Sequence, residues 1–111
     1  MIITIFRSRL DPTQAAAYQT TAAQMRKLAS EMPGFVSFKA FVADDGERLS
    51  MVVFESAETQ KAWREHSEHR EAQRLGWESF YPEFSVVVCE NPRVISKGHP
   101  AWAPSKKLEP R

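Results

Sequence analysis

The stretch FVSFKAFVADDGERLSMVVFE, which spans residues 35–55, has the composition of two β-strands joined by a tight turn. Aromatic and β-branched side chains dominate residues 35–43 and 49–55, as they do in strands. The intervening sequence DDGE, at residues 44–47, combines acidic residues with a glycine, which is typical of hairpin turns. Residues 35–55 therefore predict a β-hairpin, and the segments on either side of this hairpin decide the fold.

One strand and one helix are expected before the hairpin. Residues 2–7 form a β-branched run that is apolar on both faces, which predicts a strand that is covered on both sides. Asp11 then stands at a helix cap, and Gln14 stands where a capping-box partner belongs. Apolar side chains recur at helical spacing as far as Met32, after which a Pro-Gly pair ends the predicted helix.

A second helix and a last strand are expected after the hairpin. Ser56 is predicted to cap a helix that continues to Leu75, with Gly76 in the left-handed conformation just after its end. Pro82 opens the last strand, in which side chains alternate as far as Cys89. The order β-α-β-β-α-β predicts an α+β, ferredoxin-like fold with a four-stranded antiparallel sheet and both helices on one face.

The predicted sheet has a second apolar face that its helices do not cover. The first, second and last strands are apolar on both faces, which would expose a large hydrophobic surface on a monomer. We expect a second copy of the chain to cover it, so that residues 1–91 form one domain of a homodimeric α/β barrel. Residues 92–111 are a proline-rich tail, and its Val94, Ile95 and Trp102 are an alternative cover for the same face.

Composition limits the class of function and the compartment. The 15 Lys and Arg residues nearly balance the 14 Asp and Glu residues, so the chain has no strong charge with which to hold nucleic acid. No apolar run approaches the ~18 residues that span a bilayer, and the N-terminus lacks the features of a signal peptide. The single cysteine, Cys89, suits a reducing compartment. We therefore expect a cytoplasmic protein that binds neither nucleic acid nor a membrane.

The candidate site lies in the second predicted helix and the aromatic segment that follows it. On a regular helix, Trp63, His66, Gln73 and Trp77 would share one face, with His69 beside it. Such a stripe would wall a pocket for a flat, partly polar molecule, and the histidines would be its bases at neutral pH. The alternative is that the tryptophans belong to the core and the histidines to the surface.

Two further side chains are expected to contact a molecule in this pocket. Tyr81, at the end of the aromatic segment, would add to the aromatic wall. Lys39, on the second predicted strand, would orient an anionic group if its face lines the cavity. Otherwise the ammonium group of Lys39 would lie in water at the edge of the sheet.

A metal site is not predicted. His66 and His69 are three residues apart, whereas the helical zinc motif uses a spacing of four with a glutamate in between. Nothing in the spacing of Cys89 and His99 requires these side chains to complete such a site.

Several local patterns accompany the order of elements. They are Pro-Gly-Phe at residues 33–35, Phe-Glu-Ser at residues 54–56 before Trp63, and His-x-x-His-x-x-x-Gln-x-x-Gly at residues 66–76 with Phe-Tyr at residues 80–81. Together they resemble the antibiotic biosynthesis monooxygenase family of dimeric α/β-barrel proteins. The resemblance covers residues 1–91 and leaves out the tail.

The resemblance implies a function for the pocket. In the cofactor-free members of this superfamily, the substrate's own phenolate or enolate activates oxygen, while the protein supplies a dry pocket, a base and charge stabilisation. His66 and His69 would then be the catalytic bases, and their replacement by alanine should reduce activity without breaking the dimer. The expected function is a cofactor-independent monooxygenase acting on a small electron-rich aromatic or quinol-type compound. Aromatic and amide side chains would bind this substrate, namely Trp63, Gln73, Trp77 and Tyr81.

Two alternatives remain open. The haem-degrading members of the superfamily have a tryptophan on the second helix, an asparagine near the end of the first strand and a histidine that ligates iron. Trp63 matches this pattern, but Ser8 and Gln73 stand at the other two positions by spacing, so haem would need His66 or His69 in another pose. The second alternative is a non-catalytic module that binds a small molecule.

Overall fold

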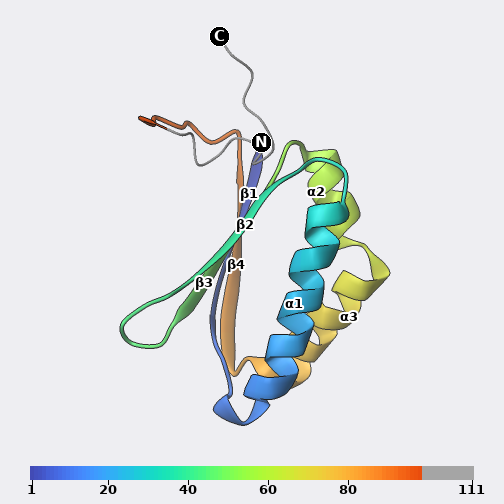
Figure 1. The fold of residues 1–111 in the computed structure, drawn as a ribbon, viewed down its shortest axis with the longest axis vertical. Helices are drawn as coiled ribbons and strands as arrows, with labels where there is room; N and C mark the ends of the chain where they lie inside the picture. Colours follow the sequence, from blue (N-terminus) through green and yellow to red (C-terminus); the bar gives the residue numbers. More distant parts are fainter. Residues whose placement is uncertain (99–111) are drawn as a thin grey trace.

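A computed structural model describes residues 1–98 of the chain (Figure 1). In sequence order the elements are β1 (Ile2–Arg9), η1 (Pro12–Gln14), α1 (Ala15–Glu31), β2 (Phe35–Val42), β3 (Arg48–Phe54), α2 (Ala57–Arg64), α3 (Ser67–Leu75), η2 (Gly76–Phe80) and β4 (Glu83–Glu90). The predicted α+β, ferredoxin-like architecture is confirmed, with the second helical region divided into two helices and a π-helical turn.

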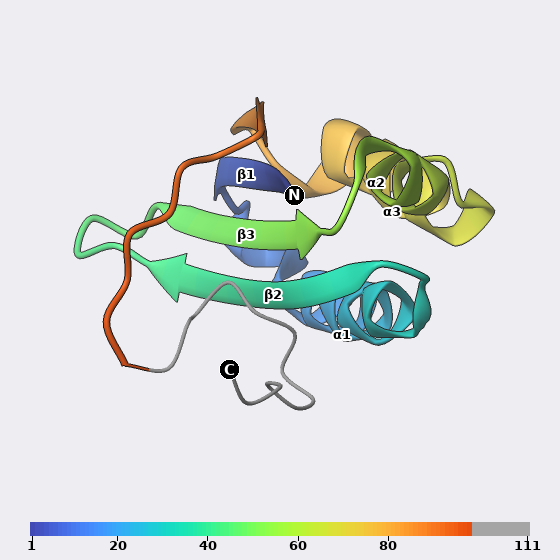
Figure 2. The same ribbon diagram turned by 90° about the horizontal axis from the view of Figure 1, so that it is seen from above.

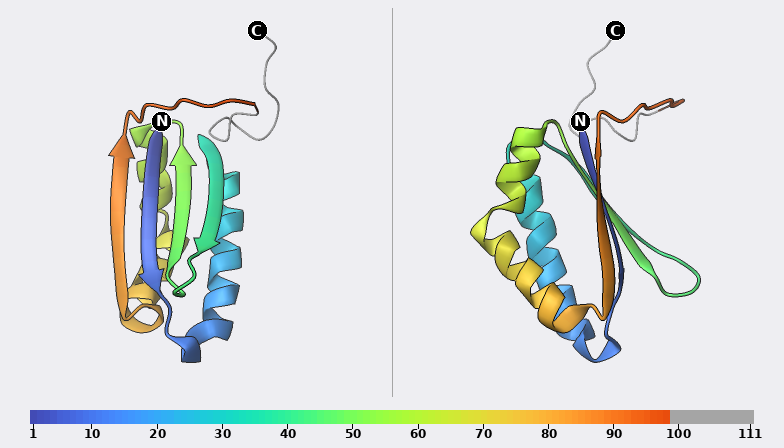
Figure 3. Two further views of the ribbon diagram at one scale, coloured as in Figure 1. Left: turned by 90° about the vertical axis from the view of Figure 1, so that its left-hand side faces the viewer. Right: turned by 180° about the vertical axis from the view of Figure 1, so that it is seen from behind.

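The four strands form one antiparallel sheet in the order β2-β3-β1-β4. All the helices lie on one face of this sheet (Figure 3), with α1 on the β2 side and α2 and α3 on the β1 side (Figure 2). Because side chains alternate along a strand, Phe6 and Ser8 face the helices, whereas Ile3 and Ile5 face away from them.

The main core lies between the sheet and the helices. Its buried members are Ala29 of α1, Val52 and Phe54 of β3, and Trp63 of α2. The Phe54 and Trp63 rings are stacked with their centroids 5.5 Å apart, which joins α2 to the sheet. Leu28 and other apolar side chains at the C-terminal end of α1 pack against this cluster.

A second apolar cluster lies on the face of the sheet that carries no helix. Ile3, Val36 and Val53 are its buried members. Partly buried side chains pack against them, namely Met1, Ile5, Met51 and Cys89. The sheet is therefore apolar on both faces, as the sequence predicted.

The first helical turn differs in detail from the prediction. The Asp11 carboxylate accepts a hydrogen bond of 2.9 Å from the Thr13 amide, so its capping role is confirmed. Gln14 makes no capping hydrogen bond through its side chain, and the predicted capping box is wrong. The reason is that η1 intervenes, so that Gln14 directly precedes α1 instead of standing in its first turn.

The predicted continuous helix from residue 57 to residue 75 is also wrong. It breaks after Arg64, and His66 adopts an extended conformation with φ −59° and ψ 136°. The His66 ring compensates by capping α3, because its Nδ1 accepts a hydrogen bond of 3.2 Å from the Glu68 amide. The break changes the direction of the chain, so residues before and after it no longer share one helical face.

Gly76 does not adopt the predicted left-handed conformation. Its φ is −60° and its ψ is −48°, and the chain continues from it into the π-helical turn of η2. A Cβ atom at this position would lie 2.9 Å from the Tyr81 ring. Glycine is therefore required here by the close approach of Tyr81 and not by the backbone conformation.

The segment after β4 crosses the end of the sheet on the side away from the helices (Figure 3). Ile95 remains 82% exposed and Val94 38% exposed, so these side chains do not seal the apolar face. Trp102, the third residue of the predicted cover, lies outside the described residues. No helix within residues 1–98 has the length and apolar character needed to cross a membrane.

Gly34, between the first helix and the hairpin, can be substituted to test how much its close contact with α2 contributes to stability. Its φ is +78°, and a Cβ atom there would lie 2.5 Å from the Thr59 side chain in the cap of α2. We expect Gly34→Ala to lower the free energy of unfolding by about 3 kcal/mol, because the left-handed conformation and the clash both disfavour a side chain. Urea unfolding followed by circular dichroism measures the change.

The matched control is Gly46→Ala in the hairpin turn. Its φ is +89°, but no atom lies within 4 Å of the added Cβ, so only the conformational cost of about 1–2 kcal/mol applies. Equal losses of stability in the two variants would show that the contact with Thr59 is unimportant.

Candidate functional site

A cavity of about 660 Å³ lies between the helices and the helix-facing side of the sheet. Alternate residues of the strands form its floor, among them Phe6 and Ser8 of β1 and Arg48 of β3. The helices and the π-helical turn form its walls through Tyr18, Trp63 and other side chains. A cavity of this size, with mostly apolar walls and a few polar groups, is typical of a small-molecule site.

Aromatic rings form one end of this cavity. The Tyr81 ring meets the Phe6 ring edge-on at 5.1 Å between centroids, and the Phe6 ring stacks on Phe84 at 5.6 Å. Tyr18 of α1 meets Tyr81 at 6.0 Å, also edge-on. Trp77 lies against Phe84 at 5.4 Å and remains 75% exposed, which places it where the cavity meets solvent. Flat ligands pack well against such rings.

Burial raises the pKa of the Tyr81 hydroxyl above its ordinary value, and the neighbouring Tyr18 raises it further, whereas Arg48 lowers it. Tyr81 therefore remains a neutral phenol at physiological pH. In this state its hydroxyl group can donate a hydrogen bond to a ligand in the cavity.

A stacked pair, Trp63 and His69, forms another part of the wall. Their ring centroids are 3.8 Å apart and the rings are inclined by 21°. The Nδ1 atom of His69 lies 3.2 Å from the Trp63 carbonyl oxygen, which can only accept a hydrogen bond. Nδ1 therefore carries the proton, and in the neutral ring Nε2 has a free lone pair.

The protonation state of His69 follows from its surroundings. Burial lowers the pKa of His69 below its ordinary value, and the hydrogen bonds to the Trp63 and Arg64 backbone oppose this effect only in part. The nearby His66 also disfavours the charged form. His69 is therefore neutral at pH 7 and has the properties of a general base.

Two polar atoms in the cavity wall have no partner. The Arg48 Nε and Trp63 Nε1 atoms are buried, and neither makes a hydrogen bond to another described residue. The Arg48 guanidinium lies over the Tyr18 ring, 5.1 Å from its centroid. Buried donors are usually satisfied, so two unpaired N–H groups beside the cavity are unusual.

The structure places five of the predicted site residues around the cavity, namely Trp63, His69, Gln73, Trp77 and Tyr81. His66 does not line it, because its ring caps α3 at the helix break. Lys39 does not line it either. It is paired with Met51 on the opposite face of the sheet, and its Nζ lies 5.6 Å from the centre of the Phe41 ring.

Sequence reasoning missed Arg48, Tyr18, Phe6 and Phe84 as site residues. Arg48 was left outside the predicted strand, which began one residue later. Its alternation with Ser50 and Val52 was a signal that could have placed it on the helix-facing side. Tyr18 stands among the helically spaced apolar positions of residues 15–32, where spacing alone does not distinguish core from cavity.

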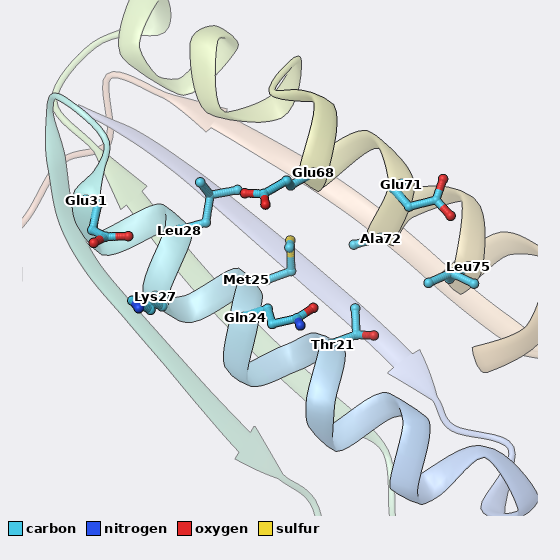
Figure 4. A pocket seen from close by; sticks show the side chains of 10 residues that line it. All are labelled: Thr21, Gln24, Met25, Lys27, Leu28, Glu31, Glu68, Glu71, Ala72 and Leu75. Carbon is cyan, nitrogen blue, oxygen red and sulfur yellow. The ribbon is translucent and has the colours of Figure 1, made fainter.

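A second, smaller cleft of about 420 Å³ lies between α1 and α3 (Figure 4). Met25 and Leu28 of α1 face Glu68, Glu71 and other residues of α3 across it. It contains none of the predicted site residues and no aromatic or histidine side chain among the residues described. The larger cavity is therefore the candidate site.

The described part of the chain contains no group of three or more His, Cys, Asp or Glu side chains placed to hold a metal ion. His99, which was considered together with Cys89, lies outside the described residues.

Comparison with known families agrees with the fold. The family model described as antibiotic biosynthesis monooxygenase matches residues 1–75. The chain belongs to the antibiotic biosynthesis monooxygenase family. The match includes Trp63 and His69 and ends before the π-helical turn and β4, which complete the aromatic end of the cavity.

One curated protein is similar to this chain over 73 residues. The uncharacterised protein YqjZ of Bacillus subtilis (strain 168) is 30% identical over 73 residues, which cover 66% of this chain and 64% of that protein. The match thus spans just under two thirds of the relative's length.

Solved structures show the same fold. The structure of Rv0793 from Mycobacterium tuberculosis has a TM-score of 0.75 and 17% identity, and the match covers 86% of this chain and 98% of that one. A crystal structure of an antibiotic biosynthesis monooxygenase has a TM-score of 0.72 and 10% identity, with 84% and 100% covered. Identities this low establish the fold alone.

The environment of His69 leads to a measurable prediction. We expect its pKa to lie below the ordinary value of 6.5, because burial disfavours the imidazolium. As pH falls, His69 would then be protonated in the unfolded chain before it is protonated in the folded chain. The contribution of His69 to stability is therefore lost as pH falls from about 6.5 through the folded-state pKa. Titration of the imidazole Cε1 proton by NMR, assigned with a His69→Gln variant, measures the value. A pKa at or above 6.5 would contradict the buried, neutral ring.

Proposed function

We propose that this protein is a cofactor-independent monooxygenase that acts on a small, electron-rich aromatic or quinol-type compound, with His69 as its base. The observation that carries the proposal is the state of the His69 ring. Its Nδ1 is held by the Trp63 carbonyl at 3.2 Å, and its pKa is lowered. A neutral imidazole with a free Nε2 in the wall of an aromatic cavity is suited to removing a proton from a phenol.

The proposed reaction starts with proton transfer from a phenolic hydroxyl group to His69 Nε2. The resulting phenolate is electron-rich enough to transfer an electron to O₂, and recombination at a ring carbon forms a peroxide. The proton held by His69 returns to the peroxide, and loss of its terminal oxygen as water, together with the hydrogen of that ring carbon, leaves a second carbonyl group and a neutral His69. One O₂ is consumed for each ring C–H that becomes C=O, and one molecule of water is released, so that atoms and electrons balance.

Other residues would assist by position and by charge. The Tyr81 hydroxyl is a donor that can stabilise negative charge as it moves onto oxygen. The rings of Phe6, Phe84 and Trp77 would hold the flat substrate and exclude water from it. Gln73, although exposed, lines the cavity near its opening and offers an amide.

Haem degradation fits these residues less well. Ser8 lines the cavity floor, and a buried hydroxyl group there does not replace an asparagine amide. Gln73 is not an effective iron ligand. Among the described residues of the lining, His69 is the single imidazole, and its ring is stacked on Trp63 with 3.8 Å between centroids.

The chain is further proposed to act as a homodimer in which the helix-free faces of two sheets pack together. This face carries buried and half-exposed apolar side chains from all four strands, among them Ile5, Met51 and Val87. Within the described residues the tail does not cover them, because Ile95 remains exposed. A second copy would remove this surface from water.

Replacing the proposed base tests the reaction. We expect His69→Ala to lower the rate of oxygen uptake by at least about 10²-fold, which is the usual effect of losing a general base. His66→Ala should leave the rate nearly unchanged, because the His66 ring caps α3 outside the cavity. Oxygen uptake is measured with a panel of hydroquinones and naphthols against a control without protein, and folding of both variants is checked by circular dichroism.

Two results would contradict this proposal. Equal activity in His69→Ala and the wild type would remove His69 from the mechanism. A complete absence of oxygen uptake above the control would instead favour a non-catalytic binding module.

The dimer is tested at Val87 of the edge strand β4, which is 51% exposed and paired with Ile5 on the apolar face. Size-exclusion chromatography with light scattering should give about twice the chain mass of 12.7 kDa for the wild type. Val87→Lys should give the monomer mass, because an unpaired ammonium would be buried in the interface. The nearly isosteric Val87→Thr is the control. A monomeric wild type at micromolar concentration would refute the proposed dimer.

A further inference from the structure

The charged side chains that line the cavity all have the same sign. Three arginines line it, namely Arg26, Arg48 and Arg64, and none of its described lining residues is an aspartate or a glutamate. The chain as a whole has 15 basic and 14 acidic residues, so this bias belongs to the cavity and not to the composition. A positive cavity with apolar walls favours a ligand that carries negative charge.

Arg48 differs from the other two arginines in its surroundings. Arg26 and Arg64 are exposed, whereas Arg48 is partly buried and its Nε is fully buried without a hydrogen-bond partner. Its sequence neighbour Glu47 does not neutralise it. The Glu47 carboxylate is bound by Arg7 through two hydrogen bonds of 2.7 and 3.0 Å.

The partly buried Arg48 side chain has no acidic partner among the described residues, and a ligand carboxylate would supply one. Arg48 is positioned for such a ligand. Its guanidinium is supported by the Tyr18 ring at 5.1 Å. Ser8 is its register partner on β1, and Ser50 follows it on the same face of β3. The guanidinium fork with neighbouring hydroxyl groups matches the planar geometry of a carboxylate.

The end of the cavity that contains Arg48 is separate from the proposed base, His69. Arg48 begins β3, whereas Trp63, on which His69 stacks, packs against Phe54 at the other end of the same strand. A ligand that uses both ends would therefore have an anionic group at one side of its ring system and a reacting group at the other. The rings of Tyr18, Phe6 and Phe84 lie at the Arg48 end, so the anionic group would be bound beside the aromatic wall.

We propose that the cavity selects aromatic acids, with the ligand's carboxylate bound by Arg48 beside Tyr18. This inference rests on the proposed function insofar as it assigns the substrate class of the same cavity. It concerns binding, however, and is measured without turnover. The ligand class is thus a planar aromatic carboxylate, and a neutral aromatic of the same shape should bind less well.

Isothermal titration calorimetry of 2-naphthoate and its isosteric amide, 2-naphthamide, tests the proposal directly. We expect the acid to bind the wild type about ten- to a hundredfold more tightly than the amide, which is the usual effect of a charge-assisted hydrogen bond. Arg48→Gln should reduce this preference to near unity, and Arg48→Lys should retain part of it. Arg70→Gln is the matched control, because it removes an exposed arginine that does not line the cavity and should keep the preference.

A second measurement does not depend on the folding of any glutamine variant. The Arg48 Nε–H resonance of the wild-type protein, assigned by its loss in Arg48→Lys, should shift when 2-naphthoate is added and not when 2-naphthamide is added. Equal binding of acid and amide to the wild type, no detectable binding of either, or an unchanged Arg48 resonance would each overturn the proposal.

The two proposals fail in different ways. An acid preference that depends on Arg48, without oxygen uptake on any quinol, would leave the ligand class standing and remove the monooxygenase reaction. Oxygen uptake that depends on His69, without an acid preference, would leave the reaction standing and overturn the role of Arg48.

Discussion

The stacking of Trp63 between the sheet and α3 is the contact on which the site depends. One face of the indole packs on Phe54, with centroids 5.5 Å apart, and His69 stacks on it at 3.8 Å. Its carbonyl oxygen also fixes the tautomer of His69. Trp63 thus joins the hydrophobic core to the proposed base. Because the core is closely packed, this contact holds the His69 imidazole in one position.

The sequence was sufficient to predict the architecture because each element carries its own local signal. Alternation defined the strands, and the acidic turn defined the hairpin. The break after Arg64 had no such signal, since neither proline nor glycine marks it and propensity favours a continuous helix. His66 provides the cap for α3, and histidine is not among the usual capping residues. Tertiary packing of His69 onto Trp63 therefore prevailed over local preference.

The site was predicted in part, and the errors have physical causes. The helical stripe required an unbroken helix, so its spacing argument placed His66 in the pocket, whereas the break turns His69 toward Trp63. The position of Lys39 was left open because a strand pattern that is apolar on both sides does not tell which face meets the helices. Arg48 was missed because strand boundaries are uncertain by a residue or more, and its neighbour marked the predicted start.

Gly76 also acts as a limit on the size of the cavity. It and Tyr81 both line the cavity, and the Tyr81 ring lies so close that a Cβ at position 76 would be 2.9 Å away. Any larger residue would displace the ring, which rests against Phe6 and Tyr18. The smallest side chain in the wall therefore sets the position of one of the largest. Natural variation or design at position 76 would change the range of ligand sizes while leaving the base and the arginines in place.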